Sequence, residues 1–427
     1  MAHLLPWFTR RDATDFRIRR GLDVTIAGAP RQEMGSRSKI TTVALLAGDY
    51  PGLRPAMKVA VGDRIAAGDV LFVDRRRPQI TITAPAAGTI LSVIGHAPRG
   101  PEQFLEIRLD GDGARTFDTP GIEATNDDAR KLLLESGMWP AFRARPFGRI
   151  PDPDARPDAI FVTAMQSDPL AANAAIVIGR HKDDFTTGLR ILGRLTDGPV
   201  HVCQAPGLPL ATGAITFAGP HPAGLPGTHI HKLYPVGNGR CVWHLNYQDT
   251  IAIGRLFTCG QAWAERIVAL AGPGVRDPRL YHVPLGASLA ELTSGELLEA
   301  DMRVISGSVL SGRKAPYLGR HHLQVSVIPE GWDAPQPSFP LRAASTALNG
   351  RPGPLVPLAS FEQVLPLDIP AVPLLRALSV GDRDAARRLG CLELVEEDVA
   401  LLSYVCPGRT DYGPLLRAVL DDIEADS

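Results

Sequence analysis

The sequence predicts a multi-domain α+β protein, and three observations support this fold class. The chain has 427 residues, enough for about two to four domains with cores of their own. Hydrophobic residues make up 44% and charged residues 21%, as in ordinary soluble globular proteins. The pattern changes along the chain from short strands, to alternating strands and helices, and finally to helices. The net charge of −1 gives no argument for nucleic-acid binding.

Short strands broken by glycine turns predict a small antiparallel barrel or sandwich in the first part of the chain. In residues 58–74, KVAVGDRIAAGDVLFVD, the pairs Gly62-Asp63 and Gly68-Asp69 supply tight turns. Residues 80–94, ITITAPAAGTILSVI, alternate strictly before Ala84 and continue as a second strand after Gly88.

The middle of the chain predicts an α/β layer with parallel strands. Residues 159–165 form an apolar run typical of a buried strand, residues 186–195 indicate a helix, and residues 199–205 indicate another strand. A glycine- and proline-rich loop, AGPHPAGLPGTHIH at 218–231, then interrupts the pattern. Open α/β sheets bind ligands at the carboxyl ends of their strands, where we expect this loop to lie.

The last part of the chain predicts a compact α+β unit followed by helices. Short strands at 266–272 and 303–312 flank one helix, and residues 374–390 and 394–408 have helical patterns. In the final helix Val399, Leu402 and Cys406 form an apolar stripe, ended by Pro407-Gly408. We therefore expect Cys406 at a helix end, facing a core.

Residues 61–90 resemble the lipoyl and biotinyl carrier domains. The two glycine-turned hairpins and the element Ala84-Pro85 to Gly88-Thr89 match that fold. Carrier domains attach their group to a lysine in the intervening turn, but this turn is Asp74-Arg75-Arg76-Arg77. A guanidinium cannot replace the lysine amine, and Lys58 lies before the first hairpin. We expect the fold without lipoyl or biotin.

The cysteines indicate neither disulfides nor an iron–sulfur cluster. There are five, widely spaced and without a C-x-x-C pair, which suits a reduced compartment. The Cys-Pro of LLSYVCPG resembles the end of a cluster motif, but no other cysteine lies within ten residues of it. Buried apolar packing is the preferred interpretation of Cys406. No apolar run reaches the roughly 20 residues that span a bilayer, so we expect a protein without a transmembrane segment.

The histidines provide candidate ligands but no complete metal motif. His229 and His231 are spaced i, i+2, so on a strand they would point to one face. His221 and His244 are near in sequence, but no flanking Cys or Glu completes a zinc spacing. We predict no metal, and no residue has the spacing of a catalytic nucleophile or base.

Long segments in order along the chain resemble the A-subunit family of the sodium-translocating NADH:quinone oxidoreductases. The resemblance runs from about Arg17 to the end. It is carried by strings such as TTVALLAGDYPGLRPAMKVAVGDR, LLLESGMWPAFRARPFGRIP, FAGPHPAGLPGTHIHKL, VWHLNYQDTIAIGRLF and YLGRHHLQVSVIPEG. That family is distantly similar to the C subunit of the Rnf complex and to the NADH-binding subunit of complex I.

The resemblance implies a domain organisation. It implies an N-terminal extension at 1–16, a lipoyl-like barrel-sandwich hybrid at 17–110, and a Rossmann-like α/β domain at 111–263. A β-grasp (SLBB-like) domain at 264–350 and a helical domain with a degenerate iron–sulfur motif at 351–427 would follow.

The resemblance also implies a function. The complex oxidises NADH, reduces ubiquinone to ubiquinol and exports Na⁺, so the chain would be a peripheral subunit on the cytoplasmic face of the bacterial inner membrane. Its partners would be the other subunits, including the integral membrane subunits. The implied enzyme activity belongs to the complex, since this chain has no complete catalytic site. Flavin is not expected, because Pro, His and Thr replace glycines in the 219–231 loop.

Two functional hypotheses remain, and they place the chain in different classes of protein. In the first, the chain binds ubiquinone in a pocket of the α/β domain, where neutral imidazoles donate hydrogen bonds to the quinone carbonyl oxygens. The candidate residues for this pocket are Asp168, His221, Gly224, Gly227, His229 and His231. In the second, the chain is a docking scaffold that binds no redox group. Membership of a divergent Rnf-like complex is a further alternative.

Overall fold

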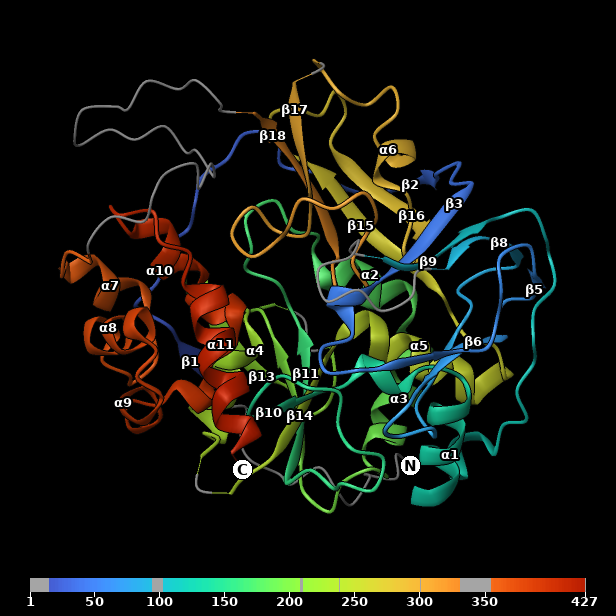
Figure 1. Cartoon of the computed structure of the whole chain (residues 1–427), viewed down its shortest axis with the longest axis horizontal. Helices are drawn as coiled ribbons and strands as arrows, with labels where there is room; N and C mark the ends of the chain where they lie inside the picture. Colours follow the sequence, from blue (N-terminus) through green and yellow to red (C-terminus); the bar gives the residue numbers. More distant parts are fainter. Residues whose placement is uncertain are drawn as a thin grey trace.

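The computed structural model describes residues 15–93, 103–207, 210–237, 239–299, 301–330 and 355–426. The strands of these residues form sheets around the middle of the molecule, and the C-terminal helices pack along one side (Figure 1). This arrangement confirms the predicted α+β fold class. Within the same ranges, no helix has the length and apolar character required to cross a membrane.

An α/β sheet forms the centre of the fold. Its strand order is β1-β13-β12-β11-β14-β10, and all neighbours are parallel except β10 and β14. The predicted strands at 159–165 and 199–205 are its central strands. The sheet comprises β1 (Asp15–Arg17), β10 (Arg143–Arg145), β11 (Ala159–Ala164), β12 (Val200–Gln204), β13 (Ile215–Ala218) and β14 (Val242–Asn246).

Both faces of this sheet are covered, which explains why β11 is apolar throughout. Every residue of β11 is buried. Ile160 and Val162 belong to the core cluster on one face, while Phe161 belongs to the cluster on the other. The first face carries α2 (Ala174–Arg180), α3 (Lys182–Leu192) and α5 (Tyr247–Cys259), and the second carries α4 (Pro226–Leu233).

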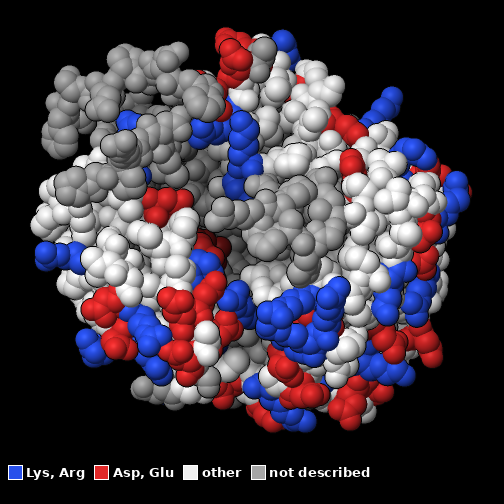
Figure 2. Space-filling view, in the orientation of Figure 1, with Lys and Arg blue, Asp and Glu red and all other residues white. Residues whose placement is uncertain are grey.

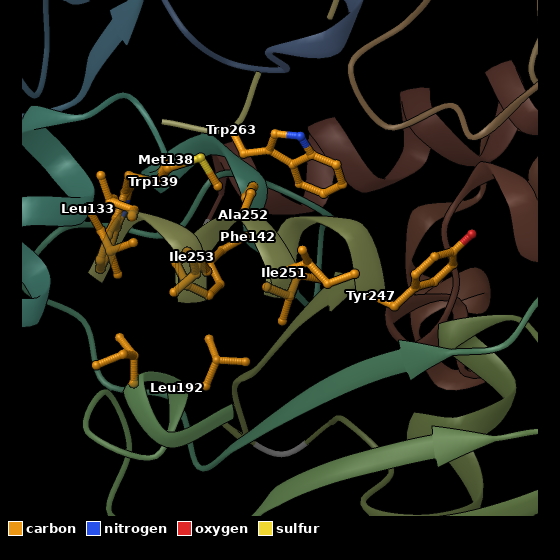
Figure 3. Close-up of a cluster of buried hydrophobic side chains, with 14 of the residues drawn as sticks. Leu133, Met138, Trp139, Phe142, Leu192, Tyr247, Ile251, Ala252, Ile253 and Trp263 are labelled. Atoms are coloured by element: carbon orange, nitrogen blue, oxygen red, sulfur yellow. The ribbon is translucent and has the colours of Figure 1, made fainter. Parts of the chain in front are cut away.

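Helices α3 and α5 cross at a pair of glycines. A Cβ at Gly188 would overlap the carbonyl oxygen of Thr250, and a Cβ at Gly254 would overlap that of Asp184. The backbones therefore approach closely only because both positions lack side chains. Figure 3 shows Ile251, Ala252 and Ile253 of α5 in the apolar cluster with Met138, Trp139 and Phe142, while Tyr247 points away from them.

The barrel consists of antiparallel strands, as predicted. One sheet has the order β3-β9-β8-β5 and the other β4-β6-β7. Gly62 and Gly68 adopt positive φ values of 92° and 88° in the predicted turns. The strands are β3 (Thr42–Leu46), β4 (Pro55–Met57), β5 (Arg64–Ile65), β6 (Val70–Asp74), β7 (Thr81–Thr83), β8 (Gly88–Val93) and β9 (Gln103–Arg108). Helix α1 (Asn126–Glu135) follows, capped by Thr125.

A mixed sheet of order β17-β18-β15-β16-β2 forms the third unit. It contains β15 (Glu265–Ala271), β16 (Arg279–Pro284), β17 (Met302–Ser306) and β18 (Gln324–Pro329), with α6 (Leu289–Leu292) between strands. Its edge strand β2 (Arg31–Arg37) comes from the N-terminal part of the chain. The range 17–110 therefore contributes a strand to this mixed sheet as well as strands to the barrel. Strand β1, which begins at Asp15, extends the central α/β sheet.

The C-terminal part is helical, as predicted. Its helices are α7 (Ala359–Val364), α8 (Ala371–Val380), α9 (Arg383–Arg388), α10 (Ala400–Val405) and α11 (Tyr412–Ala425). Val399, Leu402 and Cys406 are all buried in one cluster, which confirms the apolar stripe. Cys406 ends α10, and its Sγ lies 3.4 Å from the Tyr412 hydroxyl.

Candidate ligand-binding cavity

A cavity of about 360 Å³ opens at the carboxyl ends of β11 and β14. These strands are neighbours, but the chain passes from β11 to β12 and β13 on one side before it reaches β14 on the other. Where connections leave a parallel sheet in opposite directions, a crevice forms that typically binds ligands. The cavity therefore lies where an α/β sheet is expected to bind a small molecule.

Four parts of the chain form the walls of this cavity. The α/β sheet contributes the ends of β11 and β14, and the barrel contributes the loop before β4. The mixed sheet contributes the segments after β17 and before β18, and the helical tail contributes the turn before α10. No single domain could form the site. The lining includes Gly48, Asp49, Pro51, Arg143, Thr163, Met165, Gln166, Asp168, Gly224, Leu225, Pro226, His244, Leu245, Asn246, Tyr247, Ser308, Ser311, Arg313, His321, His322, Leu323, Val395, Glu396, Glu397 and Arg417.

Arg145, at the end of β10, joins the helical tail to the sheet behind the cavity. The side chain is fully buried. Its Nη1 donates to the Asp398 carboxylate at 3.0 Å and to the Glu393 carbonyl at 3.0 Å. Its Nε donates to His244 Nε2 at 3.3 Å. The position of the tail, and with it one cavity wall, depends on this guanidinium.

Glu397 gives the cavity a carboxyl group whose pKa is raised well above the usual value. Its Oε1 lies 3.6 Å from Arg145 Nη2. Burial raises the pKa of Glu397 to about 8, and the neighbouring Asp398 adds to this effect while Arg145 opposes it. A neutral carboxyl group can donate a hydrogen bond to a ligand, which a carboxylate cannot.

Asp49 and Arg143 fix the opposite wall. The Asp49 carboxylate accepts hydrogen bonds from Arg313 Nη2 at 2.5 Å and from the Arg320 backbone N–H at 2.9 Å. Arg143 Nη2 donates to the Asp49 carbonyl and to His321 Nε2. Burial and the nearby Arg320 lower the pKa of Arg143 to about 10, so it remains charged at neutral pH.

Three histidines in the lining are neutral at physiological pH. Burial is the main cause of the lowered pKa of each. The pKa of His322 falls to about 4, and the pKa values of His244 and His321 fall well below the usual value, where neighbouring arginines add to the effect. The cavity therefore combines neutral imidazoles and apolar side chains such as Leu225 with charged groups such as those of Arg143 and Asp49.

Comparison with known proteins identifies the family. Residues 16–107 match the NqrA N-terminal barrel-sandwich hybrid domain, residues 124–262 the NqrA second alpha/beta domain, and residues 267–316 the NQRA C-terminal domain. The A subunit of the Na(+)-translocating NADH-quinone reductase of Glaesserella parasuis is 46% identical over 448 aligned positions, covering 96% of this chain and 99% of that protein. The A subunits from Pseudomonas aeruginosa and Neisseria meningitidis serogroup C are also 46% identical, with the same coverage of both chains.

This chain belongs to the NqrA family, the A subunits of the Na(+)-translocating NADH-quinone reductase.

In this member of the NqrA family, the structure brings some of the predicted site residues together and separates others. Asp168 and Gly224 line the cavity, whereas His221, Gly227, His229 and His231 are absent from its lining. A Cβ at Gly224 would lie 2.6 Å from the backbone N of Ser167, so the loop packs directly on the segment after β11. The loop thus reaches the carboxyl end of the sheet, as expected, but through Gly224, Leu225 and Pro226.

The segment that holds His229 and His231 was predicted as a loop, and it is helical in the structure. Both lie on α4, where residues two apart project to nearly opposite sides. His229 is fully buried against Phe217, with Nε2 donating to the Ala223 carbonyl at 2.9 Å. His231 pairs with Glu393 in the helical tail at 2.7 Å. The sequence pattern misled because Pro226 begins a helix as readily as it continues a loop.

His221 and Gly227 have packing roles in the structure. His221 Nδ1 lies 3.0 Å from Ser167 Oγ, which also accepts the Gly224 N–H at 2.8 Å. A Cβ at Gly227 would overlap the carboxylate of Asp398. Both residues thus position the loop against its neighbours.

The sequence analysis missed Arg143, His321, His322 and Glu397. Adjacent histidines in YLGRHHLQV and the acidic run VEED are visible in the sequence, but only the fold brings them to the sheet. Within the described ranges, no group of three or more His, Cys, Asp or Glu side chains is arranged to hold a metal ion.

Proposed function

We propose that this chain is the ubiquinone-interacting peripheral subunit of a Na⁺-translocating NADH:quinone reductase. The complex would oxidise NADH, reduce ubiquinone to ubiquinol and export Na⁺, with this chain on the cytoplasmic face of the inner membrane beside the integral membrane subunits. Its relatives are named as A subunits of the Na(+)-translocating NADH-quinone reductase, which supports the assignment to the complex.

The cavity at the switch point of the sheet is the observation that carries the quinone assignment. A quinone head is uncharged and flat, with carbonyl oxygens that accept hydrogen bonds. Leu225, Pro226 and Leu245 offer apolar surface in the lining, and neutral His322 and Thr163 offer donors. The Thr163 hydroxyl is buried and has no hydrogen-bond partner among the described residues, whereas most buried polar groups have one.

The residues present do not fit a covalent carrier group or a cluster. The turn at the lipoyl position presents Arg75, Arg76 and Arg77, and none can form the carrier amide. Cys391 and Cys406 share the tail cluster as buried side chains, and a four-thiolate cluster needs two further sulfurs there. We therefore propose that electrons reach the quinone from other subunits, and we expect the purified chain to be colourless.

Titration calorimetry with short-chain ubiquinone tests the quinone site on the full chain. Ser311 is exposed at the cavity, so Ser311→Trp should block ligand entry with little effect on folding. Ser294 is exposed and lies outside the lining, so Ser294→Trp is the matched control. We expect binding by the unaltered chain and by the control, and its loss in Ser311→Trp. Equal binding by all three proteins would remove the cavity as the quinone site.

A basic surface favours docking as a second function. The buried Asp74 carboxylate accepts the backbone N–H groups of Arg54 at 3.1 Å and Arg76 at 3.2 Å, and the Nε of Arg77 at 3.1 Å. Arg54, Arg75 and Arg76 are exposed and form no ion pair with the described residues. Figure 2 shows one face of the molecule, on which Lys and Arg side chains gather below the middle, next to Asp and Glu side chains. Such a preorganised basic surface suits an acidic partner protein of the complex.

Charge reversal tests this docking surface. Arg75→Glu with Arg76→Glu should reduce copurification of the other subunits, because it replaces attraction by repulsion. Arg387→Glu with Arg388→Glu reverses as many exposed charges on α9 and should leave copurification unchanged. Loss of partners in both variants would indicate a general effect of charge, and loss in neither would exclude this surface from docking.

A further inference from the structure

His322 is held in one position in the wall of the cavity. A Cβ at Gly307 would approach its Cδ2 to 3.1 Å, and a Cβ at Gly319 would approach its Nδ1 to 2.6 Å. Gly307 also has a φ of +98°, which disfavours any side chain. The two glycines thus form a slot for the imidazole ring, and the ring reaches the cavity lining from it.

The hydrogen-bond partners of Ser306 favour one tautomer of the His322 ring. Ser306 is fully buried, and its Oγ accepts the Gly319 N–H at 2.8 Å and lies 2.7 Å from His322 Nδ1. The hydroxyl hydrogen is satisfied when it is donated to Nδ1. Nδ1 is then the acceptor, so the proton of the neutral ring resides on Nε2. Burial, which lowers the pKa of His322 to about 4, keeps the ring neutral at physiological pH.

The neighbouring histidine cannot play the same role. His321 Nε2 accepts a hydrogen bond from Arg143 Nη2. Because an accepting Nε2 carries no proton on a neutral ring, His321 offers no Nε2–H to a ligand. Asp168 lies in the same lining, but within the described part of the chain no hydrogen bond joins it to His322. Of the two adjacent imidazoles, His322 is the one whose Nε2–H remains available.

We propose that His322 orients the ligand of this cavity by donating a hydrogen bond from Nε2 to one carbonyl oxygen of the quinone. The inference rests on the proposed quinone-binding function and assigns the residue that recognises the carbonyl class of ligand. A donor held in a fixed position orients an acceptor of defined geometry, and a quinone carbonyl oxygen is such an acceptor.

The experiment compares two ligands on the full chain. One is short-chain ubiquinone, and the other is the same substituted ring with hydrogen in place of both carbonyl oxygens. His322→Phe keeps a ring in the slot but removes the donor, so ubiquinone should bind about tenfold more weakly. Binding of the carbonyl-free ligand should not change. The same replacement at His201, on β12 and outside the lining, should affect neither ligand.

Each alternative outcome has a separate meaning. Equal weakening for both ligands would show that His322 acts through shape, and no weakening for either would show that it donates nothing; both results overturn the inference. Absence of ubiquinone binding by the unaltered chain would overturn the proposed function and the inference together.

The inference remains testable if His322→Phe fails to fold, because two further measurements do not need that variant. Nitrogen-15 NMR of the full chain should show His322 protonated at Nε2. In Ser306→Ala, which leaves the ring in its slot, ubiquinone should bind about threefold more weakly because the tautomer is no longer fixed. A ring protonated at Nδ1 in the unaltered chain would contradict the proposal.

Discussion

The guanidinium of Arg145 and the carboxylate of Asp398 form an ion pair at 3.0 Å, with side-chain exposures of only 0% and 2%. Arg145 belongs to the central sheet, whereas Asp398 precedes α10 in the helical tail. Asp398 also accepts the Val395 N–H at 2.8 Å, so it orders its own turn as well. The pair therefore holds the tail wall of the cavity against the sheet.

Removal of one charge from this pair should be strongly destabilising. Asp398→Ala removes the closest carboxylate from the buried Arg145 guanidinium and leaves it only Glu397, at 3.6 Å. We therefore expect the free energy of unfolding to fall by about 3–5 kcal/mol. Urea denaturation measures this change. The control is Asp197→Ala, which breaks the exposed pair with Arg156 at 3.3 Å and should cost at most about 1 kcal/mol. Similar losses in the two variants would contradict the importance of the buried pair.

Gly227 should not tolerate a methyl group. Its Cβ would overlap the Asp398 carboxylate, so Gly227→Ala must displace α4 or the tail, at a cost of about 2–3 kcal/mol. Gly179, inside α2, has nothing within 4 Å of an added methyl group, so Gly179→Ala should be neutral or stabilising by up to about 1 kcal/mol. Thermal unfolding of the two variants checks the difference. A stable Gly227→Ala protein would show that α4 and Asp398 are not in close contact.

Acid should weaken the fold through His229. Burial lowers the pKa of His229 to about 4, because protonation of the ring would place a positive charge in the core. An unfolded histidine titrates near 6.5, so between pH 6.5 and 4 the unfolded chain binds more protons. The free energy of unfolding therefore falls as the pH falls through this range, by up to about 3 kcal/mol from this residue.

His229→Phe should reduce this acid sensitivity. Denaturation measured between pH 4.5 and 7.5 should show a shallower slope in the variant, although His322, which has a similarly lowered pKa, retains part of the effect. An unchanged slope would mean that the imidazole becomes charged without leaving its buried position.

Cys406→Ser tests the packing role of the thiol. The residue is 1% exposed within the tail cluster, and a hydroxyl there is more costly to desolvate than a thiol. We expect a loss of about 1–2 kcal/mol in unfolding free energy, with ubiquinone binding intact. Normal stability combined with lost electron transfer in the assembled complex would contradict a purely structural cysteine.

Local sequence patterns were sufficient for much of the fold. β11 is apolar throughout because both of its faces are buried, and the turns at Gly62 and Gly68 need positive φ. The helical spacing of Val399, Leu402 and Cys406 predicted an apolar stripe, and the structure buries all three side chains in one cluster. Each of these signals depends on neighbours within a few residues.

The site could be predicted only in part, because its walls come from distant segments. Asp168 and Gly224 could be predicted because each lies in a segment after a strand of the sheet, where ligands are expected. His322 reaches the cavity only because the mixed sheet packs against the α/β sheet, which no local pattern reveals. His229 was misplaced for a different reason: the period of α4 is helical, and a pair of histidines two residues apart fits a strand equally well.

A structure of the full chain with bound ubiquinone tests the central claim most directly. The account predicts a quinone head between the carboxyl ends of β11 and β14, with one carbonyl oxygen within hydrogen-bonding distance of His322 Nε2. A quinone bound elsewhere on the chain, or a cavity still empty at saturating ubiquinone, would contradict it.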